Sequence, residues 1–94
     1  MISQQNRVVI TGIGVVSPCG IGLDAFWKSL IDGVSGVNKI TTFDVSNHAS
    51  KIAAQVEDFD FEKLKPNDVK STSLSRNAQL AVTACDLAIK DSTL

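Results

Sequence analysis

The first part of the chain is an apolar run, Val8–Val16, which contains no charged residue and is rich in β-branched side chains. Uninterrupted runs of this kind are typical of strands that are buried on both faces of a parallel or mixed sheet. We therefore predict a strand over residues 7–16. Because helices cover both faces of such sheets, the run also predicts an α/β fold.

A short helix is predicted soon after this strand. Gly20 and Gly22 allow a tight change of direction, since glycine tolerates positive φ. Asp24 can then cap a helix that runs to about Asp32, and Gly33 ends it as a residue that accepts a left-handed conformation. The apolar face of this helix consists of four side chains, Phe26, Trp27, Leu30 and Ile31.

The middle of the chain is less regular. Val37–Phe43 is predicted to be short and extended, and the alternation in Lys51–Glu57 predicts a half-buried strand near a sheet edge or in a hairpin. A helical turn is expected over Phe61–Leu64, and Lys63–Ser73 is a polar surface connection. The predicted strand should direct three side chains to one side, Ile52, Ala54 and Val56.

A longer helix is predicted over Leu74–Lys90, with Ser73 or Ser75 as its N-cap. Its apolar surface is wide and built from small residues, which favours a helix that is pressed between layers. A strand buried on both faces also needs hydrogen-bonded neighbours along both edges, and the sequence offers too few. We therefore expect the front portion of a larger domain, completed by residues beyond Leu94 or by another polypeptide.

Composition limits the class of protein. The 94 residues carry a net charge of −1, so they provide no field that would attract nucleic acid or an anionic membrane. No apolar stretch is long enough to span a bilayer. The first six residues lack the pattern of a signal peptide, which predicts a cytoplasmic protein.

Gly12-Ile13-Gly14 after a predicted strand invites comparison with dinucleotide-binding loops. That fingerprint needs a third glycine at position 17, which is Ser17, and the following helix begins too late to direct its N-terminus at a phosphate. We favour the alternative that both glycines let a central strand pack tightly against neighbouring backbone.

No catalytic or metal-binding constellation is predicted. Cys19 and Cys85 share no spacing with each other or with a histidine that suggests a disulfide framework or a metal site, so both are expected to be reduced, buried thiols. The only histidine, His48, is expected in a solvated loop. The acidic residues of segment 57–62 should form a solvated edge from which Phe59 and Phe61 point inward.

Several segments nevertheless occur in an order and at intervals that are familiar. They are Arg7–Pro18, Gly20, Phe26–Trp27, Gly33–Val37, Thr42–Asp44, Ile52–Val56 and Asp91–Ser92. Together they resemble the N-terminus of the β-ketoacyl-acyl-carrier-protein synthases, the condensing enzymes of type II fatty-acid and polyketide synthesis. Each piece is weak alone, but the combination covers nearly the whole chain.

The resemblance implies a thiolase-like layered fold of two similar α/β halves, in a protein that forms a homodimer or heterodimer. Residues 1–94 would be the N-terminal part of the first half, with no second domain. Family members condense an acyl chain, held as a thioester on a Cys, with malonyl-carrier protein that loses CO₂, while two His and backbone N–H groups stabilise the oxyanion. These catalytic residues lie downstream of the matched region and no cofactor is implied, so the segment is expected to be inactive scaffold.

The resemblance also implies an acidic acyl carrier protein as partner, with Lys65, Lys70 and Arg76 as its contacts. The basic stretch here is thinner than in related enzymes and is broken by Asp68. In addition, Leu74–Arg76 stands where members often have an Asp-Arg pair. These two departures suggest a specialised or polyketide-associated member.

Two other interpretations stay open at this stage. The parent protein can be a non-catalytic, chain-length-controlling partner subunit of the same fold, or the chain can be a free-standing interaction domain. The residues up to Leu94 do not separate the three, and they do not distinguish a fatty-acid from a polyketide pathway.

Overall fold

The computed structural model describes residues 6–70 and 73–93. Residues 71–72 of the predicted polar connection lie outside this range, as does the start of the chain. Within the described residues, two antiparallel hairpins and three helical segments form the regular structure. In chain order these are β1 Val16–Ser17, β2 Gly20–Ile21, α1 Leu23–Asp32, β3 Val37–Lys39, β4 Ile52–Ala54, α2 Phe61–Leu64 and α3 Arg76–Asp91.

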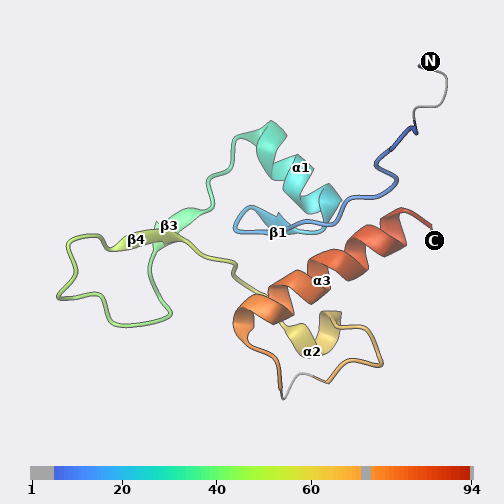
Figure 1. The fold of residues 1–94 in the computed structure, drawn as a ribbon. Coiled ribbons are helices and arrows are strands. Elements are labelled where there is room, and N and C mark those ends of the chain that lie inside the picture. The colour runs from blue at the N-terminus through green and yellow to red at the C-terminus, as the bar shows by residue number, and fades with distance from the viewer. Residues whose placement is uncertain (1–5, 71–72, 94) are drawn as a thin grey trace.

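The β1–β2 hairpin lies between two helices. α1 packs against β2, β1 contacts α3, and α2 lies beneath α3 (Figure 1). The β3–β4 hairpin projects to one side of this body, and the chain before β1 reaches out on the other side. The predicted combination of helices and strands is present, with one short hairpin as its central layer.

The predicted strand over residues 7–16 is wrong for this structure except at its last residue. Val16 pairs with Ile21, whereas residues 6–15 belong to no strand. Val8 is 93% exposed and Ile10 is 84% exposed, so the first part of the run lies in solvent, whereas residues 14–16 at its end are half-buried. A strand forms only where a neighbour runs beside it, and the described residues place no such neighbour there.

Gly12 and Gly14 bring the end of this run into close contact with α3. A Cβ atom added at Gly12 would lie 2.3 Å from the carbonyl oxygen of Ala88, and one added at Gly14 would lie 2.0 Å from that of Ala84. The two alanines are one helical turn apart, so the backbone of the run follows the backbone of the helix. The prediction that these glycines permit tight packing against neighbouring backbone is confirmed, but the segment that packs is not the predicted central strand.

The ends of the two main helices follow local sequence signals, with one exception. Gly33 ends α1 in the left-handed conformation (φ 68°, ψ 30°), as predicted. Ser75 caps α3, where its Oγ accepts a hydrogen bond of 3.3 Å from the N–H of Ala78. The prediction of Asp24 as N-cap of α1 is wrong, because Gly22 holds that position and Asp24 lies in the first turn, where the helix dipole favours a carboxylate.

β3 and β4 form a hairpin, one of the two arrangements predicted for the alternating segment, and Lys39 lies opposite Ile52. The predicted inward face is wrong for Ile52 and Ala54, whereas Val56, the third predicted residue, is half-buried. Ile52 is 59% exposed and Ala54 is exposed, whereas Ala53 between them is half-buried. The hairpin projects from the body (Figure 1), so no helix or sheet covers the face to which its alternate side chains point.

α3 is covered along only part of its surface. Thr83 is buried and the helix contacts both α2 and β1, but Cys85 and Ile89 on its flank are exposed. The expected cover on both sides is therefore not provided by the described residues. None of the helices that the structure describes combines the length and the apolarity needed to cross a bilayer.

Candidate functional site

The aromatic and acidic residues before α3 adopt the predicted arrangement. Phe61 is only 5% exposed and Phe59 is half-buried, with their ring centroids 6.4 Å apart. Asp60 caps α2, since its Oδ1 accepts a hydrogen bond of 3.1 Å from the N–H of Glu62. Over the described ranges, no cluster of His, Cys, Asp and Glu has a geometry suited to a metal ion.

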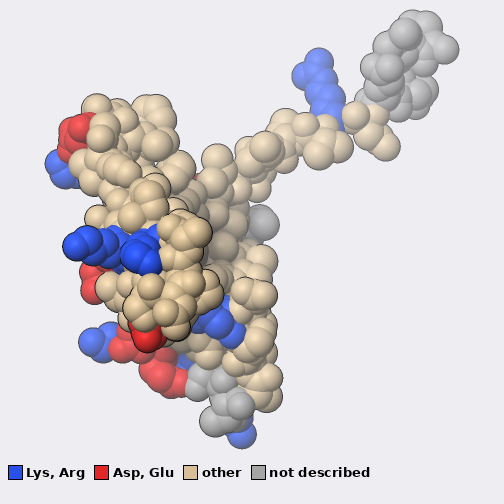
Figure 2. Space-filling model, turned by 90° about the vertical axis from the view of Figure 1, so that its left-hand side faces the viewer, with Lys and Arg blue, Asp and Glu red and all other residues tan. Residues whose placement is uncertain are grey.

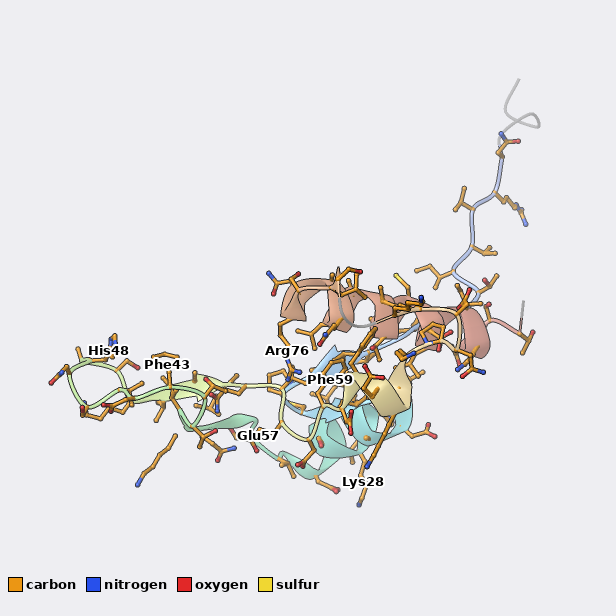
Figure 3. All side chains as sticks on the ribbon, turned by 90° about the horizontal axis from the view of Figure 1, so that it is seen from below. Lys28, Phe43, His48, Glu57, Phe59 and Arg76 are labelled. Carbon is orange, nitrogen blue, oxygen red and sulfur yellow. The ribbon has the colours of Figure 1, made fainter. Side chains whose placement is uncertain are left out.

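The three predicted carrier-protein contacts lie along the segment that leads from α2 to α3. The guanidinium carbon of Arg76 lies 4.6 Å from the centroid of the Phe59 ring (Figure 3), which is a cation–π contact. Nζ of Lys65 donates a hydrogen bond to the carbonyl oxygen of Val69. Lys70 is exposed. Arg76 and Lys65 are therefore held in place by groups of the chain itself, a phenyl ring and a carbonyl oxygen. The contact between Arg76 and Phe59 was not predicted from the sequence.

Charge elsewhere on the surface is mixed. The face shown in Figure 2 carries basic and acidic side chains next to one another, with uncharged areas between them. Three ion pairs within or beside helices contribute to this pattern, Lys28–Asp32, Lys63–Asp60 and Lys90–Asp86. Such pairs reduce the long-range field, so contacts with an acidic partner depend on individual cations.

An apolar groove of about 400 Å³ lies between α3 and the chain that follows α2. Its apolar lining consists of Pro66, Val69, Ala81, Val82, Cys85 and Ile89. The prediction that Cys85 is a buried thiol is wrong for this structure, since the residue is exposed in this groove. Sequence reasoning missed the groove because its two walls are separated along the chain and meet only when α2 packs beneath α3.

Cys19 and His48 are not brought together. Cys19 is half-buried in the turn between β1 and β2. Its N–H donates a hydrogen bond of 3.2 Å to Oγ of Ser17, and its carbonyl oxygen accepts one of 2.7 Å from Oγ of Ser29. His48 is exposed near the tip of the β3–β4 hairpin, with its ring edge-on to Phe43 at 5.8 Å (Figure 3). The prediction of His48 as a solvated loop residue is confirmed.

Comparison with protein families matches residues 5–94 to the N-terminal domain of the β-ketoacyl synthases. A Synechocystis 3-oxoacyl-[acyl-carrier-protein] synthase 2 is 34% identical over 97% of this chain and 22% of its own length. A Streptomyces coelicolor relative, whose name assigns it to actinorhodin polyketide synthesis as β-ketoacyl synthase 2, is 38% identical over 89% of this chain and 20% of its own length.

A solved structure named as the ishigamide ketosynthase/chain length factor also matches. It has a TM-score of 0.84 and 34% sequence identity, and the match covers 92% of this chain and 21% of that one. The chain therefore spans about a fifth of the length of the relatives that it matches. Sequence and three-dimensional arrangement agree over the same region.

Proposed function

The chain belongs to the β-ketoacyl synthase family, and we propose that its parent protein is a 3-oxoacyl-[acyl-carrier-protein] synthase. That enzyme would elongate an acyl thioester by decarboxylating condensation with malonyl-carrier protein. The observation that carries the proposal is the 34% identity, over 97% of the chain, with a 3-oxoacyl-[acyl-carrier-protein] synthase 2. A cytoplasmic location and a dimeric assembly stay predictions.

Within that protein, residues 1–94 would be the N-terminal part of the first thiolase-like half and would serve as scaffold. The exposure of Val8–Ile10 would otherwise count against a place in the middle of a sheet. It agrees with the proposal because the matched relatives are about five times longer, which leaves room for the neighbouring strands. Gly12 and Gly14 hold the following part of the chain against α3, so Val8–Ile10 extend from an anchored position.

The 94-residue chain alone is expected to give no condensation product, whereas the full-length protein is expected to be active. Neither Cys19 nor His48 is in a catalytic arrangement, and the thiol and imidazoles that the family uses lie downstream. The measurement is release of CO₂ and formation of 3-oxoacyl product from an acyl thioester and malonyl-carrier protein. Turnover by the isolated chain would contradict the scaffold role.

A second candidate is a non-catalytic partner subunit that controls chain length. It is favoured by the name of the matched structure, which pairs a ketosynthase with a chain length factor, and by the polyketide relative. The full-length protein, assayed alone and with a ketosynthase of the same pathway, separates the two. Activity of the protein alone supports the synthase, and activity that appears only in the mixture, without acylation of this protein, supports the partner subunit.

We further propose that Lys65 and Lys70 contact the acidic carrier protein, together with Arg76. In the full-length protein, Lys65→Glu combined with Lys70→Glu should weaken carrier binding about tenfold at low salt, because two attractive charges become repulsive. Titration of labelled carrier protein gives the dissociation constant. The matched control is Lys28→Glu with Lys39→Glu on α1 and β3, which should leave the affinity unchanged; equal affinity for both variants and the wild type would remove the proposed contact.

A further inference from the structure

The loop that joins β3 to β4 is exposed but has a defined internal structure. The N–H of His48 donates a hydrogen bond of 2.9 Å to the carbonyl oxygen of Val45. The N–H of Ser46 donates a hydrogen bond of 3.0 Å to Oδ1 of Asp44. Hydrogen bonds from Ser46 lower the pKa of the Asp44 carboxyl below its ordinary value. Together these bonds shape a compact turn at the end of the hairpin, far from the helices (Figure 1).

One side chain, Lys51, joins the parts of this loop. Its Nζ lies 3.1 Å from the carbonyl oxygen of Val45, 3.3 Å from that of Ser46 and 2.6 Å from that of His48. An ammonium group has three N–H donors and no acceptor, so each of its hydrogens has one carbonyl oxygen. The three carbonyl dipoles point at the same place, and they would repel one another without a positive charge between them.

We propose that Lys51 is a charge-dependent latch that holds residues 44–50 in a single conformation. The ammonium replaces the water that would otherwise hydrate the three carbonyl groups, and these hydrogen bonds are charge-assisted. The latch also restrains the backbone of His48, whose ring lies edge-on to Phe43, because it binds the carbonyl of His48 directly. The loop therefore presents these two rings in solvent without relying on a packed core beneath them.

The latch is separate from the bonds that hold the hairpin itself. Oε1 of Gln55 accepts hydrogen bonds from the N–H of Thr41 at 3.3 Å and from Oγ1 of Thr42 at 3.0 Å. The backbone carbonyl of Lys51, not its side chain, accepts from the N–H of Ile40 at 2.9 Å. Loss of the Lys51 charge should therefore release the loop while β3 and β4 stay paired.

Amide hydrogen exchange of the full-length protein tests the proposal. Lys51→Met keeps the length of the side chain without its charge, and it should raise the exchange rates of the Ser46 and His48 amides about tenfold, since each bonds within the loop. Lys51→Arg, which keeps a positive charge, should restore most of the protection. Lys39→Met on β3 is the matched control and should leave the loop unchanged.

The outcomes are distinguishable by where the exchange changes. A rise confined to residues 44–50 in Lys51→Met, with recovery in Lys51→Arg, supports the latch. Wild-type exchange in Lys51→Met overturns it, as does an equal rise in Lys39→Met. A rise that spreads to the amides of α3 also overturns it, because that result would assign Lys51 a role in the stability of the whole fold.

Discussion

The substitution Gly14→Ala is expected to lower the free energy of unfolding of the full-length protein by about 3 kcal/mol, or to prevent its soluble expression. The added Cβ would lie 2.0 Å from the carbonyl oxygen of Ala84 and 2.5 Å from the backbone N of Ala88. Both are main-chain atoms of α3, which cannot rotate away as a side chain would. Relief therefore requires the run and the helix to separate. The midpoint of chemical denaturation measures the loss.

Gly33→Asn is the matched control for Gly14→Ala. Gly33 has φ 68° and nothing within 4 Å of an added Cβ, so the first atom of the new side chain meets open space. Asparagine tolerates the left-handed conformation, so the free energy of unfolding should change by less than about 1 kcal/mol. A wild-type midpoint for Gly14→Ala would show that the close contact between this run and α3 is absent from the full-length protein.

The isolated 94-residue chain is expected to unfold without a cooperative transition. Its accessible surface is 7451 Å², whereas a compact monomer of its mass exposes about 5,200 Å². Its radius of gyration is 17.4 Å, against about 12 Å for a compact domain of this length. Phe61 and Thr83 are the residues that the described structure buries, which is too small a core for an all-or-none transition.

Circular dichroism during urea denaturation measures this, with differential scanning calorimetry as a second probe. The fluorescence of Trp27, the only tryptophan in the chain, is unsuited to this measurement, because the side chain is already 61% exposed before unfolding. The full-length protein serves as the control and should unfold cooperatively. A steep transition of the isolated chain by both probes would instead support the third interpretation, a free-standing interaction domain.

The candidate carrier surface illustrates what sequence reasoning could reach. The positions of Lys65, Lys70 and Arg76 could be named through the family resemblance, because they stand where related enzymes carry a basic stretch near the long helix. The groups that these side chains contact could not be predicted in the same way. The hydrogen bond from Lys65 to the carbonyl of Val69 lies within one short segment after α2. Arg76 meets Phe59, 17 residues earlier in the chain, through the tertiary fold, and no local pattern specifies that contact.

The sequence by itself determined the elements that depend on nearby residues. Helix α3 with its Ser75 cap and the Gly33 terminus of α1 rest on bonds between residues close in the chain, so their propensities are readable locally. The pairing of β3 with β4 joins Val37 to Ala54 across a long loop, so the sequence indicated only that these segments are extended. It also identified Gly12 and Gly14 as sites of close packing, because only glycine lacks the atom that would collide.

Only the tertiary structure decided what happens to the apolar run Val8–Val16. Its composition is that of a buried strand, yet just Val16 pairs, since hydrogen bonds and cover for a strand come from segments distant in sequence. The same reason explains why Ile52 and Cys85 are exposed despite their patterns. A hydrophobic pattern records which surfaces a chain is suited to bury, and the neighbouring layers decide whether that burial occurs.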